Sequence, residues 1–320
     1  MPATLGPVDA DRNKAKDFAR VFCSTLPHLR DEKNHRWGEC SLYLETSEPV
    51  QPLAELTTGY RFLLVGGFGT DCLRGTRVFS TAIEHLSTAH KITVEYFPVA
   101  PFGSSEDNGG AIARQIERGW AVDSKRKYVL VGYDKGTADL LSALRALSMP
   151  ATKVAALVSV AGTVGGSWVT ESYRTLMKPG EPWMDPGCPG NQADGLFDLS
   201  RDVRQKFLRE NPFPVAGYSI VASSDPDTTS KVLRDSWNQL TAYAVEQDGL
   251  LVAWESMLPG ARYLGTARAD HWAIALPFDS APTGFKKIDK NKFPRDALLE
   301  SIVRFVSADL DATAQKTGTP

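Results

Sequence analysis

Asp134 lies at the centre of a short segment, GYDKG (132–136), whose residue types and spacing could support catalysis. An apolar run, YVLV (128–131), precedes this segment, and a stretch with helical periodicity follows it. A strand, a sharp glycine-flanked turn and a helix together form a nucleophile elbow, which exposes a reactive side chain at the end of the strand. That position usually holds serine, so the segment raises the question of what a carboxylate could do there.

A glycine-rich segment, LLVGGFGTDC (63–72), could supply the oxyanion hole that such an elbow needs. The backbone N–H groups near Gly67 and Phe68, with that of Lys135 directly after the elbow, could stabilise a developing negative charge. The GGFG spacing does not match the G-x-G-x-x-G pattern of dinucleotide binding, so a nucleotide loop is the less favoured interpretation. We therefore expect no cofactor, and because the four cysteines show no CxxC spacing we expect no metal ion either.

The histidine and the acid of a catalytic triad are sought after the elbow, because α/β-hydrolases follow the order nucleophile, acid, histidine. His271 alone of the five histidines follows Asp134, which makes it the predicted base. Asp248 lies 23 residues before His271, whereas Asp225 and Asp227 directly follow a predicted strand. Any of these carboxylates could accept the imidazole N–H. Asp270, next to the histidine, is interpreted as a loop residue.

The segments GGFG, GYDKG, SVAGTVGGS, QDGLLVAWES and ADHWAIALP occur in an order that resembles the α/β-hydrolase superfamily, particularly its bacterial lipase and esterase branches. The resemblance covers about residues 60–280 and implies an α/β fold, the α/β-hydrolase fold, with a mostly parallel sheet, flanking helices and a cap or lid insertion. It also implies ester hydrolysis. In such lipases an Asp-Gly-Leu-Val segment about twenty residues before the histidine carries the acid, which favours Asp248 over Asp225. The similar proteins carry serine, as GYSKG, where this chain has Asp134.

Three interpretations of Asp134 follow. The favoured one is a serine-type ester hydrolase whose nucleophile has been replaced. The second is a working Asp-nucleophile hydrolase of epoxides or alkyl halides, since a carboxylate suits displacement at saturated carbon better than attack on an ester, which yields a mixed anhydride. In hydrolases of that kind Trp typically follows the elbow Asp, whereas Lys135 stands here. The third is a non-catalytic binding protein on the same scaffold. A carboxylate beside His271 is also expected to raise the imidazole pKa.

The elements that must position these residues alternate in the pattern of a parallel sheet with crossover helices. Strands are predicted at 60–65, 91–97, 128–131, 154–160 and 214–222, and helices near 75–88, 107–119, 136–147 and 294–310. We expect an N-terminal appendage (1–56), a hydrolase core (57–162 and 213–310) and a cap or lid (163–212) rich in Pro and Gly. Trp168 and Trp183 of the cap are predicted to contact an apolar substrate.

Composition narrows the class of protein. The chain has 320 residues, of which 42% are hydrophobic and 23% charged, with a net charge of −2. These values are typical of a globular protein and offer no electrostatic basis for binding nucleic acid. The resemblance to esterases and lipases implies a small, apolar ester as the partner. No segment is apolar enough for a membrane span, and the N-terminus lacks a signal-like apolar run, so the chain is expected to be cytoplasmic or secreted with its signal removed. The four cysteines are expected to be free buried thiols, with a Cys23–Cys40 bridge as the alternative if the protein is secreted.

Overall fold

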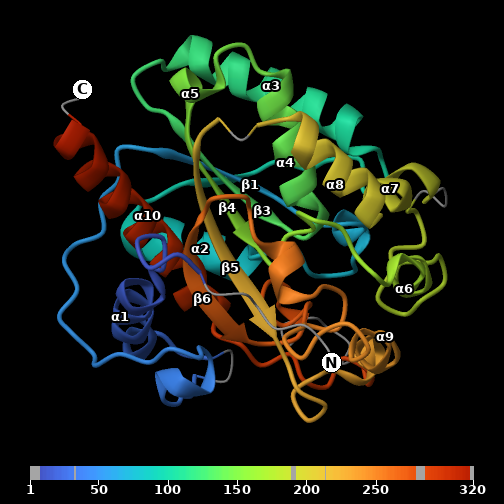
Figure 1. Cartoon of the computed structure of the whole chain (residues 1–320). Coiled ribbons are helices and arrows are strands. Elements are labelled where there is room, and N and C mark those ends of the chain that lie inside the picture. Colours follow the sequence, from blue (N-terminus) through green and yellow to red (C-terminus); the bar gives the residue numbers. More distant parts are fainter. Residues whose placement is uncertain (1–7, 32–33, 189–191, 213, 279–284, 318–320) are drawn as a thin grey trace.

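A six-stranded parallel sheet forms the centre of the molecule (Figure 1). The computed structural model describes residues 8–31, 34–188, 192–212, 214–278 and 285–317. The strands are β1 (Arg61–Val65), β2 (Val94–Tyr96), β3 (Tyr128–Tyr133), β4 (Val154–Val160), β5 (Ala216–Ser223) and β6 (Arg262–Arg268), and they lie side by side in the order β2-β1-β3-β4-β5-β6. The chain order reverses at β1, and the loops that follow β1 and β3 therefore meet at the carboxyl edge of the sheet, where ligand crevices form in open α/β folds.

Helices cover both faces of the sheet (Figure 1). The α-helices of the described residues are α1 (Ala15–Thr25), α2 (Ser80–His90), α3 (Ser105–Val122), α4 (Lys135–Ala146), α5 (Pro150–Lys153), α6 (Thr170–Leu176), α7 (Ala193–Asp198), α8 (Arg201–Glu210), α9 (Arg234–Leu240) and α10 (Arg295–Thr317). On one face α10 packs against α1 and α2, and on the other α3 packs against α4. The crossover helices predicted from the sequence correspond to α2, α3 and α4, and the predicted closing helix corresponds to α10.

The alternation of side chains along β1 shows why the strands read as continuous apolar runs. Phe62 and Leu64 join the core beneath α1, α2 and α10, whereas Leu63 and Val65 join the core beneath α3 and α4. Because both faces are covered, successive residues must be apolar on either side of the strand. The continuous apolar sequence of β1 therefore follows from the packing of helices on both faces of the sheet.

Within the N-terminal segment, α1 packs against the core. Phe18 and Phe22 of this helix are buried in the same cluster as Phe305 of α10, and Asn13 forms a bridge to Tyr263 of β6. These contacts place the segment alongside the edge strand. The division of the chain at residues 56, 162 and 212 stays a prediction.

The segment 163–212 contains α6, α7 and α8 and returns to the loop after β1. Met184 forms a bridge with Leu73, and the N–H of Asp185 donates to the carbonyl of Cys72 at 2.7 Å. Inside the segment, the indole N–H of Trp183 donates to the carbonyl of Leu176 at 2.7 Å. The described part of this segment therefore contacts the loop in which the oxyanion hole was predicted.

The expectation of free thiols is wrong. Cys23 is bonded to Cys40, and Cys72 is bonded to Cys188, so the four cysteines form two disulfides. The first lies within the N-terminal segment and was recognised as an alternative. The second joins positions 116 residues apart, and no local spacing could have indicated it. It ties the insertion to the glycine-rich loop.

Within the part of the chain that the structure describes, none of the helices combines the length and the apolar character that crossing a membrane requires.

We expect the long-range disulfide to contribute more stability than the short-range one, because a cross-link that closes a longer loop restricts the unfolded chain more. A Cys72→Ser/Cys188→Ser variant should lose about 2–5 kcal/mol of the free energy of unfolding, and a Cys23→Ser/Cys40→Ser variant less. Urea denaturation of both variants measures the difference. Free thiols in the denatured, unreduced protein would contradict the pairing itself.

Candidate active site

Asp134 occupies the sharp turn between β3 and α4. Its backbone adopts φ +50° and ψ −127°, a left-handed conformation that non-glycine residues rarely take and that nucleophile elbows use. The flanking glycines permit the turn: a Cβ on Gly132 would lie 2.6 Å from the Cα of Thr137, and one on Gly136 would lie 2.4 Å from the carbonyl oxygen of Val65. The elbow geometry thus requires glycine on both sides of Asp134.

Hydrogen bonds hold both carboxylate oxygens of Asp134. Oδ2 accepts the backbone N–H of Phe68 at 2.8 Å. Oδ1 accepts the hydroxyl of Thr163 at 2.7 Å and the phenol of Tyr173 at 2.8 Å. The side chain is closed off from solvent, with 2% of the residue exposed. A buried carboxylate without such donors would be strongly destabilising, so these three groups account for its presence in the core.

The three residues predicted to form the oxyanion hole have different relations to the elbow. Phe68 donates its N–H to Asp134. Gly67 permits the close approach, because a Cβ there would lie 2.5 Å from Oδ2 of Asp134. Lys135 is the first residue of α4, where a backbone N–H has no partner within the helix. The ammonium of Lys135 is buried against Asp139 at 2.6 Å and is thereby directed into the core.

His271 and Asp248 form a tight pair beside the elbow. Nδ1 of His271 lies 2.7 Å from Oδ2 of Asp248, and the backbone N–H of His271 donates to the Asp248 carbonyl at 2.8 Å. The other oxygen of Asp248 accepts the N–H groups of Leu250 and Leu251. Asp248 is therefore oriented by its own loop so that one oxygen is free to hold the imidazole.

The alternative acids lie elsewhere. Asp225 and Asp227 are exposed, and Asp225 accepts the N–H and the hydroxyl of Thr228 within its own turn. Asp270 is buried, but its carboxylate accepts the N–H groups of Ser230 and Ala273 instead of facing the imidazole. Geometry thus separates Asp248 from the carboxylates that sequence alone left open.

The second imidazole nitrogen faces the elbow. Nε2 of His271 lies 3.6 Å from Oδ1 of Asp134, which is an ion-pair distance and longer than a hydrogen bond. The ring lies between Tyr133, at a centroid distance of 5.2 Å, and Tyr173, at 6.1 Å. The phenol of Tyr133 also donates to the His271 carbonyl at 2.7 Å. The imidazole is consequently fixed between two carboxylates and two aromatic rings.

The neighbours of His271 and Asp134 shift the pKa values of both side chains. Burial opposes protonation of His271, but the carboxylates of Asp248 and Asp134 outweigh it and raise its pKa to about 10. For Asp134, burial opposes ionisation, but the imidazolium, the Thr163 hydroxyl and the Phe68 N–H outweigh it and lower the pKa of the carboxyl. Both shifts favour an imidazolium beside an ionised Asp134 at neutral pH.

The two tryptophans predicted to contact substrate pack against other aromatic side chains. Trp168 is partly exposed, stacks on Tyr243 at 4.2 Å and lies under the guanidinium of Arg201 at 3.6 Å. Trp183 is buried and packs edge-on against Trp272, the residue after His271, at 5.8 Å. Their role as substrate contacts stays a prediction.

Two residues of the site were missed from the sequence. Thr163 follows β4, whose carboxyl end neighbours that of β3, so the sheet-edge rule could have indicated it. Tyr173 belongs to α6 in the insertion, and its position beside Asp134 depends on how that segment folds back. No spacing in the sequence points to it.

A parallel sheet with helices on both faces, a strained turn after a central strand, a histidine and an acid from later loops define an α/β-hydrolase. The chain belongs to the α/β-hydrolase superfamily, and the predicted fold is confirmed. It is similar to the metagenomic carboxyl esterase MGS0156, with 28% identity over 96% of this chain and 97% of that one and a TM-score of 0.77. Its fold is also similar to that of the mature Bacillus licheniformis lipase BlEst2, with 17% identity, coverage of 80% and 96%, and a TM-score of 0.55. No protein-family model matches the sequence, and neither does any curated protein.

His271 is expected to stay protonated well above neutral pH. Its folded-state pKa of about 10 exceeds the ordinary value of 6.5, so the stability that the ion pair contributes is complete below about pH 6.5 and is lost as the pH rises through about 10. NMR titration of the imidazole and urea unfolding across this range measure both effects. In Asp134→Asn the pKa of His271 should fall, because one of the two facing charges is removed. An unchanged titration in that variant would contradict the proposed coupling.

Proposed function

We propose that this protein is an esterase-type α/β-hydrolase whose elbow residue, Asp134, holds the acyl-transfer machinery in an unreactive ion pair. The observation that carries the proposal is the hydrogen bond from the Phe68 N–H to Oδ2 of Asp134. In a serine hydrolase, that N–H would bind the oxyanion of the tetrahedral intermediate. Here a carboxylate oxygen of the protein itself occupies the place where this negative charge would develop.

The remaining parts suit carbonyl chemistry. With serine at position 134, the hydroxyl would lie beside Nε2 of His271, which could take its proton while Asp248 stabilises the resulting imidazolium. The Phe68 N–H would then be available to the substrate oxygen. Asp134 as a nucleophile toward an ester would instead give a mixed anhydride, a high-energy product. The chain as it stands is therefore expected to hydrolyse esters poorly.

The substrate class is proposed from two sources. Phe68 and Tyr173 lie beside the elbow in edge-to-face contact at 5.9 Å, which favours an apolar group next to the reacting carbonyl. The similarity to a carboxyl esterase and to a lipase supports ester substrates. We assign a small carboxylic ester with an apolar acyl group as the ligand type.

An Asp-nucleophile hydrolase is the second candidate, and one observation favours it. Such an enzyme needs one carboxylate oxygen held by the oxyanion donors while the other attacks, and Asp134 is held in this manner by Phe68. The phenol of Tyr173, 2.8 Å from the attacking oxygen, could protonate an epoxide oxygen as the ring opens. Against it, Oδ1 already accepts two hydrogen bonds and faces an imidazolium, which weakens it as a nucleophile.

The disulfides bear on the compartment. Two bridges that pair the four cysteines are typical of proteins that mature in oxidising surroundings. We therefore favour secretion over a cytoplasmic location for this chain. Mass spectrometry of the protein recovered from the medium and from the cytosol of its producing cell tests this, since retention in the cytosol with reduced thiols would contradict it.

Asp134→Ser should create ester hydrolysis at a rate at least about 10³-fold above that of the parent chain, since loss of the nucleophile costs serine triads roughly 10⁶-fold and the oxyanion hole retains some background activity. Hydrolysis of activated aryl esters of increasing acyl length measures the effect. Asp134→Ala is the matched control, because it also frees the oxyanion hole but offers no nucleophile. Equal rates in the Ser and Ala variants would contradict the proposal.

The second candidate makes a different prediction for the unaltered chain. Attack by Oδ1 of Asp134 on an alkyl halide would expel halide and form an alkyl ester, and water would then attack the carboxyl carbon and release the alcohol. A single turnover in ¹⁸O-water should therefore place the label in the Asp134 carboxylate, with unlabelled alcohol as product. Peptide mass spectrometry detects the label. Turnover in the parent, lost in Asp134→Ser, would favour this mechanism over the first.

A further inference from the structure

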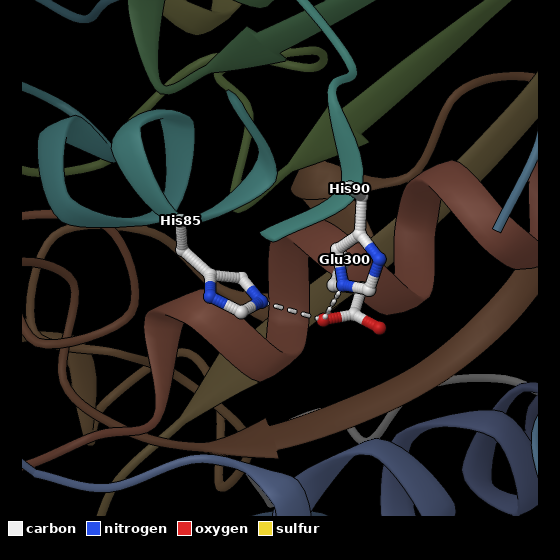
Figure 2. Close-up of side chains that lie close together, drawn as sticks. All are labelled: His85, His90 and Glu300. Atoms are coloured by element: carbon white, nitrogen blue, oxygen red, sulfur yellow. Dashed lines mark hydrogen bonds and ion pairs between the residues drawn. The ribbon is translucent and has the colours of Figure 1, made fainter. Parts of the chain in front are cut away.

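Two histidines and a glutamate converge on one point between α2 and α10, as Figure 2 shows. His85 lies in the last turns of α2, His90 is its final residue, and Glu300 projects from α10. Nε2 of His85 lies 2.8 Å from Oε2 of Glu300, and Nε2 of His90 lies 3.2 Å from the same oxygen. Residues from two helices thus aim three donor atoms at a common centre.

These donor atoms are close enough to share one ion. All three lie within 4.8 Å of one another. A zinc ion binds imidazole nitrogen at about 2.0–2.1 Å and carboxylate oxygen at about 2.0–2.2 Å, so tetrahedral ligands stand a little over 3 Å apart. The two nitrogen–oxygen distances already approach that separation, and small side-chain rotations would bring the nitrogens together.

Arg304 orients the carboxylate. Its Nε and one terminal nitrogen both lie 2.7 Å from Oε1 of Glu300, the oxygen that faces away from the histidines. This leaves Oε2 directed at the two imidazoles. A ligating carboxylate whose other oxygen is hydrogen-bonded is the usual outer-shell arrangement of protein metal sites.

The two histidines are more exposed to solvent than the glutamate. The Glu300 side chain is 4% exposed, whereas those of His85 and His90 are 21% and 22% exposed. An ion can therefore approach from the histidine side while the anionic ligand stays in a poorly hydrated setting, where its attraction for a cation is stronger. The nearby guanidinium of Arg304 partly offsets that attraction, so we expect moderate affinity.

We propose that His85, His90 and Glu300 form a binding site for one divalent transition-metal ion, for which Zn²⁺ is the best match. Imidazole nitrogens favour Zn²⁺, Cu²⁺, Ni²⁺ and Co²⁺ over the hard ions Mg²⁺ and Ca²⁺, which prefer all-oxygen sites. The histidines would bind as neutral ligands through Nε2, Glu300 would bind through Oε2, and water would complete the tetrahedron. This site shares no residue with the site at the elbow.

Topology assigns the site a structural role. A helix that joins two parallel strands runs antiparallel to them, so the end of α2, which leads into β2, lies at the amino edge of the sheet. Asp134 follows β3 and lies at the carboxyl edge. The ion would accordingly cross-link α2 to α10 at the far end from the elbow, and it would stabilise the fold without touching the substrate site.

The test uses full-length protein without an affinity tag, stripped with EDTA, and Zn²⁺ itself as the probe. Isothermal titration calorimetry should show one ion bound per chain. At a free Zn²⁺ concentration about 100 times the dissociation constant, the thermal midpoint should rise by about 5 °C. Mg²⁺ and Ca²⁺ should leave it unchanged. A chain that binds no Zn²⁺, or is not stabilised by it, would overturn the proposal.

Variants separate the cluster from incidental histidine binding. Glu300→Gln and His90→Gln should each weaken Zn²⁺ binding at least about tenfold, whereas His28→Gln, at an exposed histidine outside the cluster, should leave it unchanged. His90 is partly exposed, so its replacement should preserve the fold even if that of buried Glu300 does not, and circular dichroism checks both. Binding that survives in His90→Gln and falls in His28→Gln would assign the ion elsewhere and refute the site.

Discussion

The buried contact between Asp134 and the imidazolium of His271 is the constraint on which the rest of the site depends. Asp134 and Asp248 face one imidazole, so burial of the group leaves an excess negative charge that the protein must offset with donors. The N–H of Phe68 and the hydroxyls of Thr163 and Tyr173 supply them. Each donor comes from a different loop or helix, and the charge at the elbow therefore fixes how those segments meet.

This dependence explains why α6 contacts the elbow residue. Tyr173 of α6 donates to Asp134, and the Cys72–Cys188 disulfide joins the same insertion to the glycine-rich loop. A serine at the elbow would offer a weaker acceptor to the phenol than a carboxylate does, so the contact of α6 with the elbow depends on the identity of residue 134.

The local features of the site could be predicted from the sequence, whereas the long-range ones could not. The elbow depends on a strand, two glycines and a helix that are contiguous, and the order of Asp248 and His271 is fixed by chain topology. Tyr173 and the Cys72–Cys188 pair depend on the path of an irregular insertion. Strand β6 was missed because its sequence, RYLGTAR, has arginine at both ends and a glycine, Gly265, at φ +118°, so it lacks the apolar run of the other strands.

Ester hydrolysis and displacement at an alkyl carbon would affect the Asp134–His271 ion pair differently. With an ester substrate, no favourable reaction neutralises the carboxylate of Asp134, because its attack on the carbonyl would give an unstable anhydride. With an alkyl substrate, the carboxylate would become a neutral ester, one of the two charges facing His271 would vanish, and the imidazole pKa would fall toward the range in which it acts as a base. The Asp134–His271 ion pair, which would block ester hydrolysis, would thus be broken by alkylation of Asp134. Two hydrogen bonds to the attacking oxygen oppose that first step, so the contacts of Oδ1 with Thr163 and Tyr173 support our proposal of a blocked esterase.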